Sequence, residues 1–302
     1  MKQKFSWKLM KKQRYLLMMS VPFLVWVIIF KYIPLWGWTM AFQDVRPASF
    51  AVPVWERAFV GLENFAKVFS DRLFMQTMIN TLGSSILGIV LGTVSAIFFS
   101  LMLNEVRFIR FKKITQTISY LPHFVSWVII ASIAKMFLND GGVLETMLGA
   151  KLHLMSTNSP LFWVVVCFID IWKEVGWNAI IYLSAMAGID QGLYEAAKVD
   201  GANRFQRMWH ITLPGIRPTI VVILIMSIGG ILNVGMERQM LLSNAIVQDH
   251  AMVLSWLAYV RGIGNNNYGM GTAIGMFQSL VGIILLFIAN KIAGMMGEGK
   301  LV

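Results

Sequence analysis

Six long apolar stretches constrain the fold of this chain more than any other feature of its sequence. A membrane-spanning helix needs about 20 consecutive, mostly apolar residues to cross a hydrocarbon layer roughly 30 Å thick. The stretches lie at residues 15–36, 76–103, 114–138, 160–187, 217–236 and 270–292. They predict an all-α membrane protein with six transmembrane helices. No segment between them is apolar enough to build a core of its own, so we expect a single domain over residues 1–302.

The composition agrees with a protein that sits in lipid. Hydrophobic residues make up 57% of the chain and charged residues only 14%, whereas soluble domains carry about 25% charged residues. The single cysteine, Cys167, lies in an apolar run and has no partner within the chain. A pair of soluble domains, a disordered chain, a collagen-like chain and a disulfide scaffold are therefore excluded.

The positive charges predict how the chain lies in the membrane. On the assumption of six spans, 16 of the 26 Lys and Arg residues fall on one side, in the N-terminal segment, the second and fourth loops and the C-terminal tail, and 8 fall on the other side. Lys and Arg concentrate in cytoplasmic loops. We therefore expect both termini in the cytoplasm and anionic lipid as the partner of the excess charge. Nucleic acid is not expected, because no basic groove with interleaved aromatic residues emerges.

Small residues recur every four positions in two of the stretches, and such spacing places them on one helix face, where another helix can approach closely. We expect close helix packing at both places, and a bend or helix start at Pro122. The residues are Ser84, Gly88, Gly92, Ala96 and Ser100 in the second stretch and Gly271, Gly275 and Ser279 in the last.

The loop at residues 188–216 is too ordered in its sequence to be a plain linker. Asp190 is suited to cap a short helix, Gly201 to end it with a positive φ, and Asn203 to cap the next helix. The expected product is a helix, a tight turn and a second helix on the cytoplasmic face. The first helix would leave a small apolar patch exposed unless another protein covers it, formed by Leu193, Ala196, Ala197 and Val199.

This loop resembles the EAA motif of permease subunits of binding-protein-dependent ABC importers. That pattern is Glu-Ala-Ala, three residues, Gly, nine residues and Ile-x-Leu-Pro, and every element is present: Glu195, Ala196, Ala197, Gly201 (followed by Ala202), Ile211, Leu213 and Pro214. Segments 61–65, 80–82 and 120–127 extend the resemblance over most of the chain and point to the carbohydrate-uptake branch, of the oligosaccharide or polysaccharide type.

The resemblance implies a fold, a function and a set of partners. The fold would be that of a type I ABC importer permease, and the loop would be the coupling helix that docks in a separate ATPase subunit. The expected partners are a second permease, giving a heterodimer, two ATPase subunits, an extracytoplasmic solute-binding protein, the lipid bilayer and a carbohydrate substrate. ATP and magnesium would be bound by the ATPase subunits. The chain would lie in the plasma membrane of a prokaryote, crossing it several times, and would catalyse no reaction itself.

The sequence argues against a nucleotide-binding site and against an enzymatic site. Residues Gly294–Lys300 resemble a phosphate-binding loop, but the next residue is Leu301 rather than Ser or Thr, and no helix follows to receive the phosphate. The four histidines are scattered without the spacing of metal ligands and without a nucleophile beside them. We expect no catalytic residue, no metal and no nucleotide site in this chain.

An ion-coupled secondary transporter or channel is the more serious alternative. Asp170, Lys173 and Glu174 lie inside the fourth stretch, where charged residues often form ion relays. Asp170 and Lys173 are three positions apart and are expected to pair, whereas the adjacent Lys173 and Glu174 do not share a helix face. The coupling loop favours the importer, because an ion-driven transporter needs no docking helix for an ATPase.

A sugar path needs amides and carboxylates for the hydroxyl groups and aromatic rings for the sugar faces. The fourth stretch offers Trp177 and Asn178, and the outer end of the fifth offers Asn233 and Glu237. A polar group facing lipid leaves its donors and acceptors unsatisfied. We therefore predict that these four residues line the substrate path.

Overall fold

The computed structural model describes residues 13–295 and 297. Most of the basic N-terminal segment and part of the Gly294–Lys300 segment lie outside these residues. The described chain is helical, and its β-structure is limited to one isolated bridge between Gln43 and Phe59. The prediction of an all-α protein is therefore confirmed for this part of the chain.

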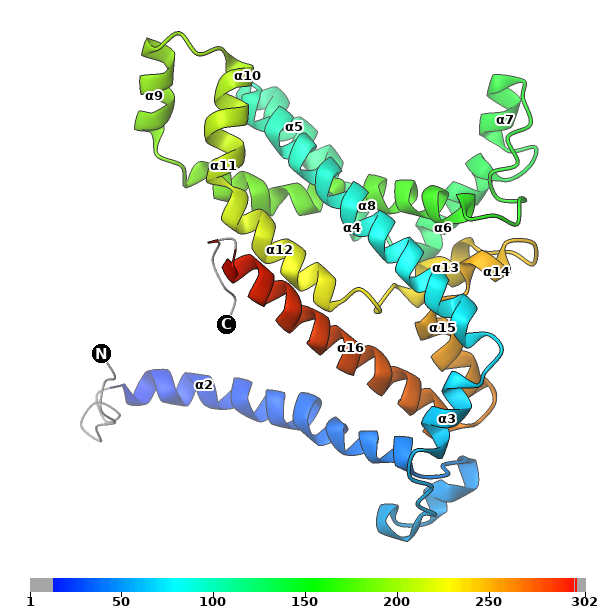
Figure 1. Cartoon of the computed structure of the whole chain (residues 1–302). Helices are drawn as coiled ribbons and strands as arrows, with labels where there is room; N and C mark the ends of the chain where they lie inside the picture. Colours follow the sequence, from blue (N-terminus) through cyan, green and yellow to red (C-terminus); the bar gives the residue numbers. More distant parts are fainter. Residues whose placement is uncertain (1–12, 296, 298–302) are drawn as a thin grey trace.

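The first apolar stretch forms a single rod that stands apart from the body of the protein (Figure 1). It consists of α2 (Arg14–Val27), a π-helical turn, η1 (Ile28–Tyr32), and a 3₁₀ segment, η2 (Ile33–Phe42). No side chain of α2 is buried, and only the end of the rod packs, through η2, against the last helix, α16 (Tyr268–Met295). Its apolar surface is thus left for lipid or for another chain.

Three further long helices form the body with α16: α4 (Phe74–Glu105), α8 (Leu161–Ala187) and α12 (Arg217–Gly229). α4 packs along α8, and α12 packs along α16. Between the first rod and α4 the chain forms an ordered segment with η3 (Pro47–Ala51), η4 (Val54–Glu56) and α3 (Glu63–Phe69). These helices agree with the predicted apolar stretches to within a few residues, except in the fifth.

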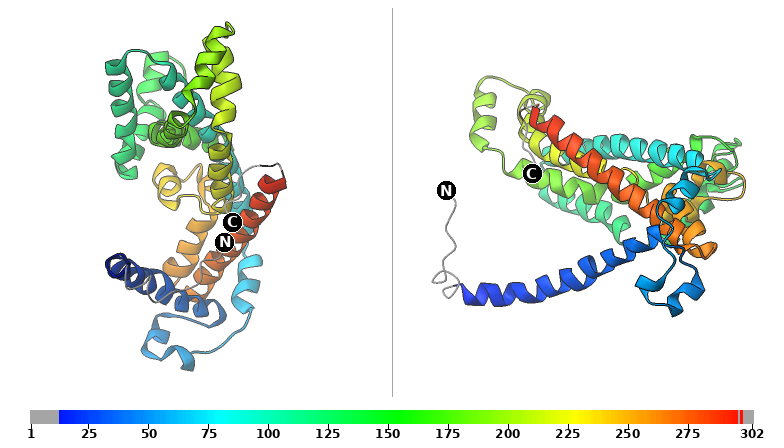
Figure 2. Two further views of the ribbon diagram at one scale, coloured as in Figure 1. Left: turned by 90° about the vertical axis from the view of Figure 1, so that its left-hand side faces the viewer. Right: turned by 60° about the horizontal axis from the view of Figure 1, so that its bottom comes forward.

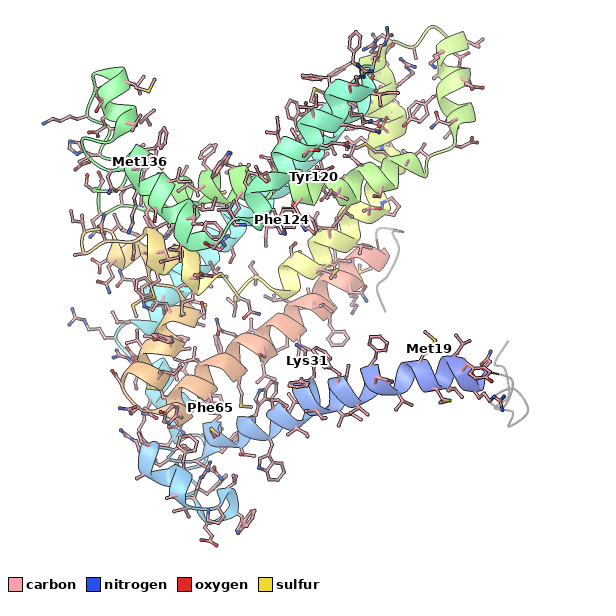
Figure 3. The ribbon with its side chains drawn as sticks, turned by 180° about the vertical axis from the view of Figure 1, so that it is seen from behind. Met19, Lys31, Phe65, Tyr120, Phe124 and Met136 are labelled. Carbon is pink, nitrogen blue, oxygen red and sulfur yellow. The ribbon has the colours of Figure 1, made fainter. Side chains whose placement is uncertain are left out.

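The third stretch is broken into two helices. α5 (Ile109–Tyr120) ends at a 3₁₀ turn, η5 (Leu121–Phe124), and α6 (Trp127–Leu138) begins after it. Figure 3 shows the bend at Phe124, with Tyr120 on one arm and Met136 on the other. The cause is the expected one, because the second residue of η5 is Pro122, which lacks the N–H that would continue the helix. A short helix, α7 (Val143–Leu148), follows.

The fifth stretch is also broken, and here the predicted range 217–236 is wrong. α12 ends at Gly229, residues 230–235 are not helical, and a short helix, α13 (Met236–Leu242), follows. Two consecutive glycines favour this break, because glycine is a poor helix former. α14 (Gln248–Ala251), α15 (Leu254–Tyr259) and the π-helical turn η7 (Val260–Gly264) then lead to α16.

By length and apolarity, four helical segments can cross a membrane: Arg14–Phe42, Phe74–Glu105, Trp127–Leu148 and Tyr268–Met295. A fifth is added if Arg204–Gly215 and α12, which meet at 55°, count as one span. α8 is long enough, but Asp170, Lys173 and Glu174 lie in its middle. The described structure therefore establishes four or five apolar spans, and six remains a prediction.

The ends of the long elements sort to opposite sides of the molecule. The start of α2, the end of α16 and the helix α9 (Gln191–Val199) lie at one end, and α3 and α14 lie at the other, as Figures 1 and 2 show. Buried side chains form one large cluster around α6, α8, α15 and α16 and a smaller one around Tyr182, Met208 and Ile216, near α9. The loop with the motif is thus attached to a packed part of the protein.

Candidate functional site

A cavity of about 270 Å³ lies between α4, α8 and the break that follows α12. Small and polar side chains dominate its wall, with a mixture of hydroxyls, amides and charged groups. They include Ser84, Ser85, Gly88 and Gly92 of α4, Asp170, Glu174 and Asn178 of α8, and Ser227, Asn233 and Arg238 around the break. Helices from distant parts of the chain contribute to this wall, and a wall of this kind can bind a hydrophilic ligand at the depth of the membrane.

The face of small residues on α4 lies partly in the wall of this cavity, and the expectation of close helix packing there holds only in part, because Ser84, Ala96 and Ser100 are buried while the two glycines face open space. A Cβ atom added at Gly88 or Gly92 would have no heavy atom within 4 Å. The same expectation is correct in the last helix at Gly271, where an added Cβ would lie 2.6 Å from the Cα of Gly262. In α4 the repeat leaves room for a ligand at its two glycines.

The break after α12 is stable because side chains from three helices bind its free carbonyl groups. In a membrane, backbone groups outside helices must find partners within the protein. Ser85 of α4 donates to the carbonyl of Ile231, Gln278 of α16 to that of Leu232 (2.7 Å), and Ser255 of α15 to that of Val234 (2.9 Å). Interrupted helices of this kind often mark the binding sites of transporters.

The charged residues of α8 pair differently from the prediction. Asp170 binds Arg238 of α13, with 2.7 Å between Oδ2 and the guanidinium nitrogen, and Lys173 binds Glu174, with 3.1 Å between Nζ and Oε1. The predicted pair of Asp170 and Lys173 does not form, because Lys173 turns toward the break in the third stretch. Its Nζ donates to the carbonyls of Pro122 (3.3 Å) and His123 (2.7 Å).

Two of the four predicted path residues lie in the cavity wall. Asn178 and Asn233 are both among its lining residues. Trp177 lies outside the wall and stacks on His123, with ring centroids 4.2 Å apart and nearly parallel. Glu237 is exposed on α13 and also lies outside the wall. Position along a helix suggested all four, but only the tertiary structure shows which side of the helix faces the cavity.

Two polar atoms around the cavity have no hydrogen-bond partner within the described part of the chain. They are Ser84 Oγ and Arg238 Nε, and both are buried. Buried polar groups are nearly always hydrogen-bonded, to protein or to ordered water. Both residues line the cavity, but these two atoms are themselves buried, so they can bind a ligand there only after a side-chain rotation.

The loop with the motif folds as its sequence predicts. Asp190 caps α9 by accepting a hydrogen bond from the N–H of Gly192 (2.9 Å). Gly201 has a φ of +77° and forms the turn. Asn203 caps the next helix in a reciprocal pair of hydrogen bonds with Gln206 (2.8 and 2.9 Å). The predicted helix, turn and second helix are confirmed.

The second helix of the loop attaches it to the body of the protein. It consists of α10 (Arg204–Arg207), a π-helical turn, η6 (Met208–Thr212), and α11 (Leu213–Gly215). Met208 and Leu213 pack in the smaller core cluster, and the hydroxyl groups of Tyr194 and Thr212 bond across the two helices (2.9 Å).

The two halves of the motif therefore differ in exposure. None of the residues of α9 is buried, and the exposed side chains of Leu193 (53%) and Val199 (89%) form the apolar patch that the sequence predicts. Glu195 and Ala196 are exposed beside them. Ile211 and Leu213, in the second half, are partly buried. In this loop α9 is exposed, whereas the second helix packs into the body of the protein.

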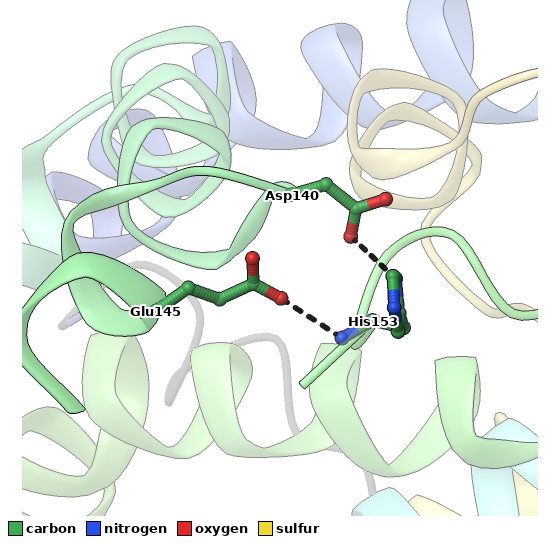
Figure 4. A group of neighbouring side chains, drawn as sticks. All are labelled: Asp140, Glu145 and His153. Atoms are coloured by element: carbon green, nitrogen blue, oxygen red, sulfur yellow. Dashed lines mark hydrogen bonds and ion pairs between the residues drawn. The ribbon is translucent and has the colours of Figure 1, made fainter. Parts of the chain in front are cut away.

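Asp140, Glu145 and His153, which lie before, in and after the short helix α7, come together after α6 (Figure 4). Their ligand atoms lie within 4.8 Å of one another, as in a metal site. The carboxylate of Glu145, however, already accepts hydrogen bonds from three backbone N–H groups, those of Gly141 (2.8 Å), Leu152 (2.7 Å) and His153 (3.0 Å). These hydrogen bonds explain the cluster without a metal, because Glu145 holds the backbone of the surrounding loop in place.

Comparison with known proteins identifies the chain. Residues 88–294, which include the whole loop and all of the cavity wall except Ser84 and Ser85, match the family model of the binding-protein-dependent transport system inner membrane component. The chain belongs to this family. Membership makes it a membrane-spanning transport component and confirms the resemblance found in the sequence.

Relatives of known name cover nearly the whole chain. It is 39% identical over 95% of its length to the polygalacturonan/rhamnogalacturonan transport system permease protein YteP of Bacillus subtilis, of which 90% is covered. It is 40% identical over 94% of its length to protein LplB of the same organism, also covered to 90%.

Solved structures of similar sequence share the fold. A chain from the crystal structure of a bacterial ABC transporter that imports the acidic polysaccharide alginate superposes with a TM-score of 0.84, at 35% identity, over 96% of this chain and 98% of that one. The structure of an alginate ABC transporter in complex with an alginate pentasaccharide-bound periplasmic protein gives a TM-score of 0.85 at 34% identity, over 98% and 99%. The type I importer permease fold is therefore established for this permease.

Proposed function

We propose that this permease is the membrane-spanning subunit of an ATP-driven importer of oligosaccharides or polysaccharides. The observation that carries the proposal is the cavity at the interrupted helix, in a chain whose relatives include a permease for polygalacturonan and rhamnogalacturonan and whose structural neighbours import alginate. The chain holds the path, and it transports without catalysing a reaction of its own.

The cavity wall suits a saccharide. Sugar hydroxyl groups both donate and accept, so they need amides, hydroxyls and carboxylates around them. Asn178 and Asn233 offer amides, and the Ser84 hydroxyl and the Arg238 Nε–H, both buried and unpaired, become available after a side-chain rotation. These residues form part of the substrate path in our proposal. Trp177 and Glu237 would belong to it only through a rearrangement or at its outer entrance.

The helix α9 is proposed to dock in a separate ATPase subunit. Its apolar side chains are exposed in the single chain, and Glu195 lies beside them, so the surface fits a partner with a cleft. Gly201 and Ala202 hold the turn, and Ile211, Leu213 and Pro214 connect the docked helix to the body. The two ATPase subunits would bind ATP and magnesium, and closure of their cleft would reach the spans through this loop.

The remaining partners and the topology complete the proposal. A second permease, different in sequence, would close the cavity from the other side, and a solute-binding protein outside the cell would deliver the sugar, as in the alginate transporter that was solved with its periplasmic protein. We propose six spans, with α8 as one of them, because its three charged residues are paired and need not face lipid. Both ends of the chain and α9 would then be cytoplasmic.

Reconstitution tests the proposal against an ion-driven transporter. The permease, co-purified with its partners, is placed in liposomes with the solute-binding protein outside, and uptake of labelled oligosaccharide is measured with ATP inside as the only energy source. We expect uptake with ATP and none with an imposed ion gradient alone. A matched preparation carrying Glu195→Lys should insert normally and lose the ATP-driven uptake. Uptake that follows the ion gradient and ignores ATP would overturn the assignment.

A further inference from the structure

The break in the third stretch, residues 121–126, is bound to α8 by a compact set of contacts; we refer to it as the hinge segment. Lys173 donates to the carbonyls of Pro122 and His123, and His123 Nδ1 donates to Glu174 Oε2 at 2.6 Å. The ring of His123 also lies flat on that of Trp177. The bend seen in Figure 3 is therefore held in place by two adjacent charged residues of one helix.

Glu174 belongs to two structures at once. It lines the cavity, and among the described lining residues it alone forms a hydrogen bond with the hinge segment. Its second oxygen binds Lys173 at 3.1 Å. His123, Lys173 and Trp177 lie outside the cavity wall. A ligand in the cavity can therefore reach the hinge segment through one carboxylate.

We propose that Glu174 transmits the occupancy of the cavity to the hinge segment, as a positioning residue that acts through His123. The proposal rests on the proposed function, in which the cavity receives a saccharide. A hydroxyl group that donates to Glu174 shares the carboxylate with His123, so the bond to His123 weakens when the cavity fills. α5 is then free to change its angle to α6.

The direction of α5 shows which part of the molecule such a change would move. α5 runs from the hinge segment toward the end of the molecule where α10 and α9 lie (Figure 1). Its last turn lies directly on α8, because a Cβ added at Gly176 would lie 2.2 Å from the carbonyl oxygen of Ser119. A small rotation at the hinge segment would therefore move a packed helix rather than a loose loop, as hinge motions in proteins do.

The variant His123→Phe isolates the proposed step. Phenylalanine keeps a ring on Trp177 but cannot donate to Glu174, and position 123 lies outside the cavity wall, so no sugar contact is lost. The measured quantity is the ratio of ATPase rates with and without sugar-loaded binding protein, in the complete importer in liposomes. We expect the ratio to fall roughly tenfold, which corresponds to about 1.4 kcal/mol, because the basal rate rises toward the stimulated one when the bond is absent without sugar.

Two further variants separate the hydrogen bond from the packing. His123→Gln keeps an N–H donor without the ring, and we expect it to restore most of the stimulation. His250→Phe is the matched control. His250 of α14 packs edge-on against Trp163 of α8, the helix that also carries Trp177, with ring centroids 6.0 Å apart, and both residues lie outside the cavity wall. It should leave the ratio unchanged. A His123→Gln protein as impaired as His123→Phe would assign the effect to packing and contradict the proposal.

A probe in the hinge segment gives a readout that is independent of hydrolysis. A single cysteine at position 126, in a Cys167→Ala background, is treated with a thiol reagent with and without sugar-loaded binding protein. The labelling rate should change on addition of sugar in the otherwise unaltered importer and stay constant in the His123→Phe protein. Unchanged stimulation and an unchanged labelling response in His123→Phe would overturn the inference. An importer that transports no saccharide at all would instead contradict the proposed function.

Discussion

At the scale of single residues, Lys173 connects α8 to the hinge segment. It is 4% exposed and binds one carboxylate and two carbonyl groups of a helix break. In the variant Lys173→Met these three acceptors lose their donor at membrane depth. Leaving a buried polar group unpaired costs about 1 to 3 kcal/mol, so we expect a clearly lower Tm of the purified permease.

The matched control for this prediction is Lys151→Met, in an exposed loop. Surface changes of this kind usually stay within about 0.5 kcal/mol. Equal melting temperatures of the two variants would show that the carbonyls of the hinge segment find other donors.

A second residue-scale prediction concerns pH. Asp71, just before α4, forms two hydrogen bonds with Arg261 of η7 (2.6 and 3.0 Å). Burial alone would raise the pKa of Asp71, but the hydrogen bonds from Arg261 and from the Leu73 N–H, with the positive charge of Arg261, hold it below 3.8. A lowered folded-state pKa gives stability that is present above the unfolded pKa and is lost as the pH falls below it.

The variant Asp71→Asn measures this contribution. We expect it to lower Tm at pH 7, and the difference from the unaltered permease should shrink as the pH falls through and below 3.8. Thermal unfolding of the detergent-purified protein over a series of pH values is the measurement. A difference that stays constant with pH would mean that the charge of Asp71 contributes nothing and that only the shape of the side chain matters.

The same scale shows what sequence reasoning can reach. Asn178 and Asn233 were predicted to line the path because polar groups in a span need polar surroundings, and both lie in the cavity wall. The pairing of Asp170 with Arg238 was out of reach, because helical spacing relates only residues three or four positions apart. An aromatic ring such as that of Trp177 can face lipid, pack in the protein or bind sugar equally well. The sequence therefore could not predict that Trp177 stacks on His123, which depends on the tertiary fold.

At the scale of elements, local chemistry was the reliable guide. The caps of α9 and α10 and the positive φ of Gly201 depend on neighbouring residues, and all three were predicted. The end of α12 at Gly229 was missed, because the apolar run continues past it and the stabilising donors come from three other helices. The opening at Gly88 and Gly92 of α4 was missed for a related reason, since small residues serve a helix contact and a cavity equally well.

The turn of the coupling loop yields the element-scale prediction. Gly201 has a φ of +77°, and an added Cβ would meet no atom within 4 Å, so a substitution there acts through the backbone alone. Such strain costs on the order of 1 to 3 kcal/mol. We expect Gly201→Val to reduce ATPase association several-fold or more, and Gly201→Asn, which tolerates this conformation, to reduce it much less.

Co-purification of the ATPase subunits with the tagged permease measures the effect. Gly192→Ala in the neighbouring helix is the control, because its added Cβ lies 3.4 Å from the nearest atom, Oδ1 of Asp190, which is close to an ordinary contact. If Gly201→Val and Gly201→Asn retained the ATPase equally, the turn conformation would not matter for docking.

At the scale of the whole molecule, the single chain leaves much apolar surface uncovered. The rod of α2 has no buried side chain, and the cavity is open between α4, α8 and α12. An apolar helix surface is stable against lipid, but a polar cavity at membrane depth needs a further wall to exclude the lipid. This asymmetry supports a second permease on the cavity side, since lipid alone can cover α2 but cannot complete the cavity.

The last prediction fixes the orientation of the whole molecule. If the chain has six spans, 16 of the 26 Lys and Arg residues belong to the ends and loops that share a side with α9 and 8 to the other loops, so the side of α9 should be cytoplasmic. Cysteines are placed singly at Gln191, in α9, and at Thr157, in the loop after α7; both positions are exposed. In intact cells a membrane-impermeant thiol reagent should label position 157 and leave position 191 unlabelled until the cells are opened. Native Cys167 is buried and should stay silent in both states, which provides an internal control. Ready labelling at position 191 in intact cells would invert the topology, and a docking site for cytoplasmic ATPase subunits on α9 would then be physically impossible.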